Sequence, residues 1–172
     1  GLLGRVLEDL KKIECHPTLN YTYDKNLITP ENWNLQGFKL RDYQDEAIRA
    51  AVSSYRRIIQ SPTGSGKTLM MAGIVKALQG RKMVILFDAK QLLTQTYEFL
   101  STTCKLDNIG LCYGEGYIYG DVMLCTVQSI EKILDTHLEE TEVLMVDEVH
   151  KFGNGKHRLA AIQSFPKAQY RI

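Results

Sequence analysis

From residue 40 to the end of the chain, short apolar runs alternate with segments in which apolar side chains recur every three or four positions. The runs are typical of strands buried on both faces, and the spaced segments are typical of amphipathic helices. Their alternation predicts a mostly parallel sheet covered by helices on both faces. Strands are predicted at residues 57–61, 83–88, 109–113, 122–126 and 142–147, with a last strand from 169. Helices are predicted at residues 42–54, 66–79, 90–102, 127–136 and 157–164.

The first 38 residues have a different pattern. Leucine, valine and isoleucine recur at helical spacing over residues 2–13, with charged residues between them, which predicts a short amphipathic helix. Residues 15–38 are rich in proline, asparagine and glycine, so we expect turns there, with room for a short strand at 19–23. We therefore divide the chain into an N-terminal helix and linker at 1–38, a partial accessory module, and one domain at 39–172.

Composition narrows the class of protein. Hydrophobic residues make up 44% and charged residues 24% of the 172 positions, which is ordinary for a packed domain and excludes wholesale disorder. The net charge of +1 gives no overall field that would attract polyanions. The four cysteines form no C-x-x-C pair, so neither a zinc cage nor a disulfide framework is indicated. No apolar run approaches the roughly 20 residues that span a bilayer. We expect a cytoplasmic protein without a membrane partner.

Residues 61–68 read Ser-Pro-Thr-Gly-Ser-Gly-Lys-Thr between a predicted strand and a predicted helix, which is the context of a phosphate-binding P-loop. Gly64 and Gly66 can adopt positive φ, so that consecutive backbone N–H groups turn toward phosphate oxygens. Lys67 is predicted to reach the β- and γ-phosphates of ATP, and the Thr68 hydroxyl to ligate Mg²⁺. The loop residues assigned to the cofactor are Thr63, Gly64, Ser65, Gly66, Lys67 and Thr68. The alternative is an accidental Gly-Lys-Thr in a surface loop.

A second group of polar residues follows the apolar run at 143–146, which ends in Asp147-Glu148-Val149-His150. Ligands of parallel sheets bind beyond the carboxyl ends of the strands, so we expect these side chains at the same edge as the P-loop. Asp147 is predicted to hold Mg²⁺, and Glu148, the catalytic carboxylate, to orient the attacking water. Lys67 and His150 complete the predicted catalytic set. The alternative is a helix N-terminus that carries two acids.

Together, the P-loop and Asp147-Glu148-Val149-His150 resemble the motifs of superfamily 2 helicases and translocases of the DExH kind. Within that superfamily the chain resembles the UvsW-like phage helicases first and the XPB-like helicases next. The resemblance implies the first RecA-like lobe of an ATP-dependent DNA helicase, which unwinds or branch-migrates DNA in recombination, repair or replication in a bacterial or phage-infected cytoplasm. It implies ATP and Mg²⁺ as cofactors, and DNA, RNA or an RNA–DNA hybrid as partner.

The resemblance extends to a nucleotide-base motif upstream of the P-loop. Leu40-Arg41-Asp42-Tyr43-Gln44 resembles the family's adenine-recognition motif. The family pattern implies that Gln44 bonds the adenine edge and that Arg41 stacks on the base. An amide suits this role because it both donates and accepts hydrogen bonds. The alternative is that Gln44 is a polar residue on an exposed helix face.

Three further stretches resemble the nucleic-acid-binding motifs of the same family. Residues 87–93 resemble motif Ia, with Asp88 and Lys90 in place of the usual proline and threonine, and residues 125–129 resemble motif Ic. A glycine-containing loop at 114–116 lies where motif Ib is expected. The resemblance implies phosphate contacts from Ala89, Lys90, Gly114, Thr126 and Gln128. A helix cap and a plain turn are the alternatives for these positions.

The family pattern also implies parts beyond residue 172. A motif III and a second RecA-like lobe with an arginine finger are expected downstream, and such a finger is worth about 10³ to 10⁵ in rate in other nucleotide hydrolases. We therefore expect this chain alone to bind ATP weakly and to hydrolyse it poorly. Two other functions stay open: a nucleotide-gated nucleic-acid-binding module without translocation, and the motor lobe of a restriction-type translocase.

Overall fold

The computed structural model describes residues 33, 35, 37–137, 139–152 and 156–172. The predicted N-terminal helix and the strand at 19–23 lie outside the described residues. Trp33 and Leu35, which the sequence division assigned to the linker, are buried in the core, and Trp33 Nε1 donates a hydrogen bond to Asp45 Oδ1 at 2.7 Å. These two residues are therefore packed as part of the domain.

The centre of the molecule is a six-stranded sheet with the order β3-β2-β4-β1-β5-β6. Its strands are β1 (Met83–Phe87), β2 (Ile109–Tyr113), β3 (Gly116–Ile118), β4 (Val122–Thr126), β5 (Val143–Val146) and β6 (Tyr170–Arg171). All neighbouring pairs are parallel except β2 with β3. The predicted mostly parallel sheet is confirmed, and the carboxyl ends of its parallel strands lie along one edge.

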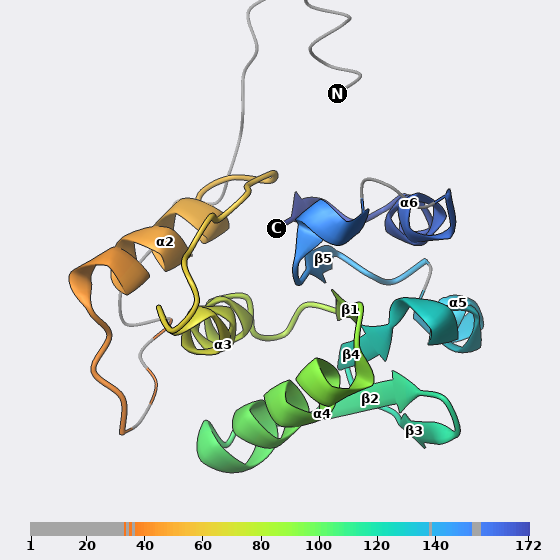
Figure 1. Cartoon of the computed structure of the whole chain (residues 1–172), viewed down its shortest axis with the longest axis horizontal. Helices are drawn as coiled ribbons and strands as arrows, with labels where there is room; N and C mark the ends of the chain where they lie inside the picture. Colours follow the sequence, from red (N-terminus) through yellow and green to blue (C-terminus); the bar gives the residue numbers. More distant parts are fainter. Residues whose placement is uncertain (1–32, 34, 36, 138, 153–155) are drawn as a thin grey trace, which may run out of the picture.

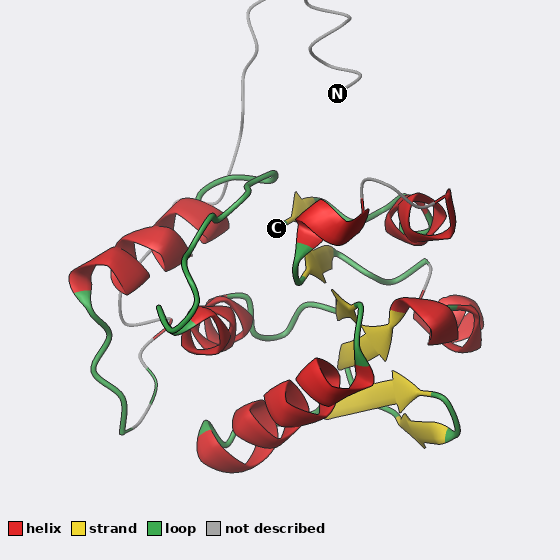
Figure 2. Ribbon diagram, in the orientation of Figure 1, coloured by secondary structure: helices red, strands yellow, loops and turns green. Residues whose placement is uncertain are grey.

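Helices cover both faces of this sheet (Figure 1). They are α2 (Asp42–Val52), α3 (Lys67–Ala77), α4 (Lys90–Glu98), α5 (Glu131–His137) and α6 (Lys156–Gln163), and a π-helical turn at Phe99–Thr103 extends α4. Figure 2 shows α3 and α4 on one side of the strands and α5 and α6 on the other. In the described part of the chain, no helix combines the length and apolar character that a membrane span requires.

The central strand β1 explains the unbroken apolar runs in the sequence. Its five residues are all buried. Met83, Ile85 and Phe87 pack in the core on the α2–α4 side, whereas Val84 and Leu86 pack in the core on the α5–α6 side. Because successive strand residues face opposite sides, a strand covered on both sides must be apolar throughout. Each such side chain contributes about 1.5–3 kcal/mol through burial.

The strand predicted at residues 57–61 is wrong. Only Arg56 pairs, in an isolated parallel bridge with Arg171, and the Arg57 N–H donates to Arg171 O at 3.0 Å. Ile58 is 77% exposed. The partner strand β6 is two residues long, so it offers hydrogen bonds to one or two residues of this segment and none to the rest. Two adjacent isoleucines do not make a strand without a partner strand to satisfy its backbone.

The short strand β3 was not predicted. Gly114 and Glu115 form the turn that joins it to β2, and Tyr117 and Ile118 are exposed on it. After β3 the chain passes close to β2 again: a Cβ added to Gly120 would lie 2.2 Å from the backbone nitrogen of Gly110. The hairpin therefore requires glycine where its two backbones touch.

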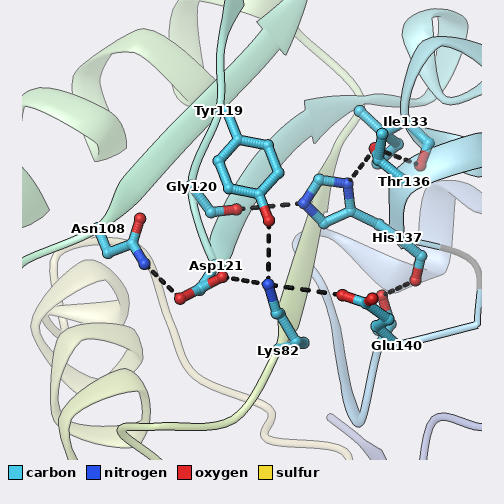
Figure 3. Close-up of polar contacts among 10 residues, drawn as sticks. Lys82, Asn108, Tyr119, Gly120, Asp121, Ile133, Thr136, His137 and Glu140 are labelled. Atoms are coloured by element: carbon cyan, nitrogen blue, oxygen red, sulfur yellow. Dashed lines mark hydrogen bonds and ion pairs between the residues drawn. The ribbon is translucent and has the colours of Figure 1, made fainter.

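The amino-terminal edge of the sheet is held by a network of charged side chains around Lys82, the residue before β1. Its amino group binds the carboxylates of Asp121 and of Glu140, the latter at 3.5 Å, and donates to the Tyr119 hydroxyl oxygen at 3.0 Å. Asn108 donates to the other oxygen of Asp121. Figure 3 shows these side chains converging on Lys82. The hydrogen bonds to Asp121 and Tyr119 raise the pKa of Lys82 above its ordinary value.

The buried His137 side chain at the end of α5 adds two contacts at the same edge of the sheet. Its Nε2 lies 3.2 Å from the carbonyl oxygen of Gly120, and its Nδ1 lies 2.7 Å from Thr136 Oγ1 (Figure 3). Both ring nitrogens therefore have partners although the residue is buried, as burial of a polar ring requires. The network ties the starts of β1 and β4 to the end of α5.

Candidate functional site

The P-loop lies between the irregular segment after Arg57 and α3. Gly64 and Gly66 have φ angles of +79° and +84°, in the left-handed region that glycine adopts without steric cost. Gly66 is required for a second reason: a Cβ at this position would lie 2.5 Å from Gln44 Nε2. Because α3 begins at the next residue, its N-terminus points its dipole toward the loop, an arrangement suited to an anion.

Gln44 holds the P-loop through its side-chain amide. Its Nε2 donates to Ser65 O at 2.8 Å and its Oε1 accepts from the Arg41 N–H at 3.0 Å. The side chain is 4% exposed, so the alternative of an exposed helix position is wrong. These two bonds use one of its two amide N–H groups and one of its two oxygen lone pairs, so the implied adenine contact stays a prediction. Gln44 thus connects α2 to the P-loop.

Tyr43 is a site residue that the sequence analysis missed. Its hydroxyl donates to Ser65 O at 2.8 Å and accepts from an Arg41 guanidinium nitrogen at 3.2 Å. Arg41, Tyr43 and residues 61–65 line a cleft of about 530 Å³, within the usual size of a small-ligand site. A tyrosine in the first turn of a helix carries no sequence signal for this role, because its partner is a backbone oxygen 22 residues away.

The structure brings the P-loop lysine and the acidic motif together. Lys67 Nζ lies 3.6 Å from Glu148 Oε1 and 3.4 Å from Ser61 O. His150 Nδ1 lies 3.3 Å from Glu148 Oε2, so one carboxylate lies between a lysine and a histidine. Glu148 and His150 follow β5, whereas Lys67 begins α3, so their convergence depends on how α3 packs against the sheet. The three residues predicted to be catalytic thus form one cluster.

The two adjacent carboxylates are held at an energetic cost. Burial, followed by the charge of Glu148, raises the pKa of Asp147 above its ordinary value, and Lys67 opposes this shift. The φ angle of Glu148 is +54°, a left-handed conformation that costs a residue with a side chain about 1–2 kcal/mol. Like charges and backbone strain at one position are more typical of functional sites than of stabilising structure.

The donor set suits a magnesium ion that shares its coordination with phosphate. Asp147 offers a carboxylate at the end of β5, and Thr68 offers a hydroxyl in the first turn of α3. Across the described residues, no group of three or more histidine, cysteine, aspartate or glutamate side chains could enclose a metal. Mg²⁺ is usually held by one or two carboxylates together with substrate phosphates and water, so these residues fit the ion only beside a bound nucleotide.

The loops after β1, β2 and β4 meet along the same carboxyl edge. The Lys90 amino group lies 4.3 Å from the centroid of the Tyr113 ring, at the end of β2. The exposed Ala89 directly precedes α4, and Gln128 is exposed in the turn after β4. The structure therefore places the predicted nucleic-acid residues of three separate motifs side by side.

Two of those predicted contacts have their donor groups bonded within the protein. The Gly114 N–H donates to Ser129 Oγ at 3.0 Å, and Thr126, which is 5% exposed, donates its hydroxyl to the same oxygen at 3.1 Å. The Lys132 amino group binds Gly114 O. Ser129 and Lys132 were missed by the sequence analysis. Lysine on an exposed helix position is too common to be singled out without its neighbours.

Comparison with known proteins gives partial matches to named helicases and translocases. The DNA 3'-5' translocase XPB2 of Sulfurisphaera tokodaii is 30% identical over 65% of this chain. The chloroplastic DExH-box ATP-dependent RNA helicase DExH15 of Arabidopsis thaliana is 26% identical over 68% of this chain. The chain spans 25% and 11% of the lengths of these two proteins, respectively.

Solved structures share the fold at low sequence identity. The UvsW helicase from bacteriophage T4 matches with a TM-score of 0.73 at 16% identity, over 99% of this chain and 68% of that one. A hypothetical ATP-dependent RNA helicase from Sulfolobus tokodaii matches with a TM-score of 0.65 at 18% identity, over 78% of this chain and 46% of that one. Both support the RecA-like fold.

The sequence of residues 37–172 matches the family described as "Type III restriction enzyme, res subunit". This match covers the P-loop, the acidic motif and the loops of the carboxyl edge. The chain therefore belongs to this family of helicase-type ATPases, and it folds as a RecA-like helicase lobe.

Proposed function

We propose that this chain is the ATP-binding lobe of an ATP-dependent DNA translocase or helicase. The observation that carries the proposal is the 3.6 Å contact between Lys67 Nζ and Glu148 Oε1, beside a loop whose two glycines are in the left-handed conformation. A cation at a helix N-terminus, a glycine-rich loop and a strained carboxylate are the parts that nucleotide hydrolysis needs.

The roles of the residues follow from their partners. The amino group of Lys67 exchanges the Glu148 carboxylate for phosphate oxygens when ATP binds. This exchange leaves Glu148, still held by His150, to orient the attacking water and to accept its proton. Asp147 and Thr68 hold Mg²⁺, whose charge neutralises the phosphate oxygens when it is bound. The ion pair between Lys67 and Glu148 thus links nucleotide binding to activation of the water.

The cleft beside the P-loop takes the rest of the nucleotide. Arg41 stacks its guanidinium plane on the base, because arginine is exposed at the mouth of the cleft and stacks well on aromatic faces. Tyr43 and Gln44 hold the carbonyl oxygen of Ser65 and so fix the loop that binds the phosphates. The two internal hydrogen bonds of Gln44 use one N–H and one oxygen lone pair, so its second N–H and second lone pair are the groups that bond the adenine edge.

DNA is the proposed partner, and RNA is the second candidate. The 30% identity to a protein named as a DNA translocase supports DNA, whereas the 26% identity to a protein named as an RNA helicase supports RNA. Binding of oligo(dT) and oligo(rU) of equal length, measured by fluorescence anisotropy at matched salt, separates the two. Tighter binding of the RNA would overturn the DNA assignment and leave the ATPase proposal intact.

We further assign the chain to a longer parent protein, which unwinds or branch-migrates DNA in recombination or repair. The small share of the named relatives that the chain spans supports a second RecA-like lobe as its intramolecular partner. Residues 1–38 then belong to an accessory module and residues 39–172 to the first lobe. Such a lobe grips phosphates and reads the geometry of the nucleic acid more than its base sequence.

The substitution Lys67→Ala tests the nucleotide site. We expect the affinity for a fluorescent ATP analogue with Mg²⁺ to fall about 10- to 100-fold, because charge-assisted hydrogen bonds to phosphate are lost. Lys76→Ala is the matched control, since Lys76 lies in the last turn of the same helix and its amino group bonds Gln79 Oε1 at 2.9 Å. Equal affinity in the Lys67→Ala variant and the wild type would contradict the proposal.

A further inference from the structure

The hydroxyl of Ser129 connects two loops of the carboxyl edge. Ser129 lies at the end of the turn at Val127–Ser129 and is 6% exposed. Its Oγ accepts a hydrogen bond from the Gly114 N–H at 3.0 Å and another from Thr126 Oγ1 at 3.1 Å. Gly114 follows β2 and Thr126 ends β4, so one buried oxygen fixes the ends of two neighbouring strands relative to each other.

This arrangement changes which groups can meet a phosphate. A serine oxygen has two lone pairs, and the two donors use both of them. The Gly114 N–H and the Thr126 hydroxyl are therefore directed at Ser129 and away from solvent. A phosphate on this edge would have to displace Ser129 before it could bond either donor.

Exposed side chains surround this junction on the solvent side. The Lys132 amino group bonds the carbonyl oxygen of Gly114, and the Lys90 amino group lies over the ring of Tyr113, the residue before Gly114. Gln128 is exposed in the turn that Ser129 ends. Two cations and one amide thus lie around the end of β2, positioned by the backbone that Ser129 holds.

We propose that Ser129 is a positioning residue for nucleic-acid binding, and that Lys132 makes the direct phosphate contact that the sequence analysis assigned to Gly114 and Thr126. The inference rests on the proposed binding of nucleic acid by this lobe. Ser129 contacts no phosphate. It fixes the turn that carries Gln128. It also fixes Gly114, whose carbonyl oxygen bonds the Lys132 amino group.

The salt dependence of binding distinguishes a positioning residue from a phosphate contact. Each phosphate contact to a single strand adds about 0.7 to the slope of log K against log salt. We expect Ser129→Ala to lower the affinity for fluorescent oligo(dT) about 3- to 10-fold at every KCl concentration, with an unchanged slope. We expect Lys132→Ala to lower both the affinity and the slope, the slope by about 0.7.

A second pair of variants keeps the test independent of folding defects. Thr126→Val retains the shape of the side chain and removes its hydroxyl, and Ser129→Cys retains the size of serine with a weaker acceptor. We expect both to weaken binding without a change in slope, and the double variant Thr126→Val/Ser129→Ala to be no weaker than Ser129→Ala alone, because the two groups act through one hydrogen bond. Ser164→Ala and Lys76→Ala serve as controls, because the Ser164 hydroxyl bonds Ala160 O and the Lys76 amino group bonds Gln79 Oε1, outside the Ser129 hydrogen bonds.

The outcomes separate this inference from the proposed function. A wild-type chain that does not bind oligo(dT) or oligo(rU) overturns the proposed nucleic-acid binding and this inference with it. Wild-type binding with a reduced slope in Thr126→Val or Ser129→Ala would show direct phosphate contacts and overturn the inference alone. An unchanged slope in Lys132→Ala would do the same. ATP-analogue affinity and thermal unfolding are expected to stay at wild-type values in Lys132→Ala.

Discussion

Each edge of the sheet places two carboxylates near one lysine, and the two edges differ in how these groups are bonded. At the amino-terminal edge, the Lys82 amino group pairs with the carboxylates of Asp121 and Glu140, which are far apart in the chain, and donates to the Tyr119 hydroxyl (Figure 3). At the carboxyl edge, Asp147 and Glu148 are adjacent like charges that face the single amino group of Lys67. The first edge is held by contacts within the protein, and the second is the edge at which we propose that ATP and Mg²⁺ bind.

The glycines at the two edges of the sheet also have different surroundings. At the amino-terminal edge, Gly110 and Gly120 allow two backbones to touch, and a Cβ on either would lie within 2.5 Å of backbone nitrogen. At the carboxyl edge, a Cβ on Gly64 would meet nothing within 4 Å, and glycine there serves a positive φ beside open space. Close backbone packing requires glycine at Gly110 and Gly120, whereas the positive φ favours glycine at Gly64. The stability of the domain and its readiness to bind are therefore located at different ends of the same strands.

The largest effect on stability is expected from Gly120→Ala at the amino-terminal edge. The new Cβ would overlap the backbone of β2, and overpacking against backbone costs about 3 kcal/mol or more. Urea denaturation measures the free energy of unfolding. Gly80→Ala is the control, because a Cβ there has open space and pays only for a φ of +90°, about 1 kcal/mol. Equal losses of stability in the two variants would show that close backbone approach does not distinguish the two edges.

A smaller loss of stability is expected from Lys82→Met, which leaves Asp121 and Glu140 without their shared cation. Half-exposed ion pairs are worth up to about 1 kcal/mol each, so we expect a loss of about 1 kcal/mol in urea denaturation. Nucleotide affinity should not change, since the residue lies at the opposite edge from the P-loop. Lys167→Met, which breaks one exposed pair with Glu139, should cost less. A loss of ATP-analogue affinity in Lys82→Met would show that the edges are coupled.

The smallest effect on stability is expected from Asp147→Asn, and it should be an increase in the free energy of unfolding. A raised pKa means that the native state favours the protonated form of Asp147, so its negative charge at neutral pH destabilises the fold. The asparagine variant should therefore unfold a few degrees or less above the wild type at pH 7. The gain should shrink as the pH falls toward the ordinary value of 3.8, because the wild type then takes up the proton itself.

Thermal unfolding followed by circular dichroism across this pH range measures the Asp147→Asn effect. Asp135→Asn, on an exposed position of α5, is the control. Magnesium-dependent ATP-analogue binding should weaken in Asp147→Asn alone, since the carboxylate is the proposed metal ligand. A variant that is less stable than the wild type at neutral pH would show that the acidic pair stabilises the domain, against the comparison of the two edges.

Elements with a strong apolar pattern were predicted well, and those that depend on a distant partner were not. The periodicity of residues 109–113 and 122–126 matches β2 and β4 residue for residue. The segment at 57–61 has only two adjacent isoleucines among polar residues, and it finds only the two residues of β6 beside it. The hairpin strand β3 is short and exposed, so burial left no pattern in its sequence.

The candidate site shows the same division. The glycines and lysine of the P-loop were readable because their chemistry is local: positive φ and a helix N-terminus follow from neighbouring residues. The roles of Tyr43, Gln44 and Ser129 were not readable, because each depends on a backbone group brought close by folding. For Gln44 the family resemblance pointed to a base, and the structure adds two partners within the protein.

The sequence by itself determined the alternating β and α order, the phosphate-binding loop and the acidic motif, because apolar periodicity and glycine conformation are written into consecutive residues. Only the tertiary structure decided that Lys67 and Glu148 form a pair, that Ser129 joins two loops and that the opposite edge is closed by Lys82. Those contacts join residues that lie far apart in the chain, and their energies depend on burial and charge that no single segment possesses before it packs.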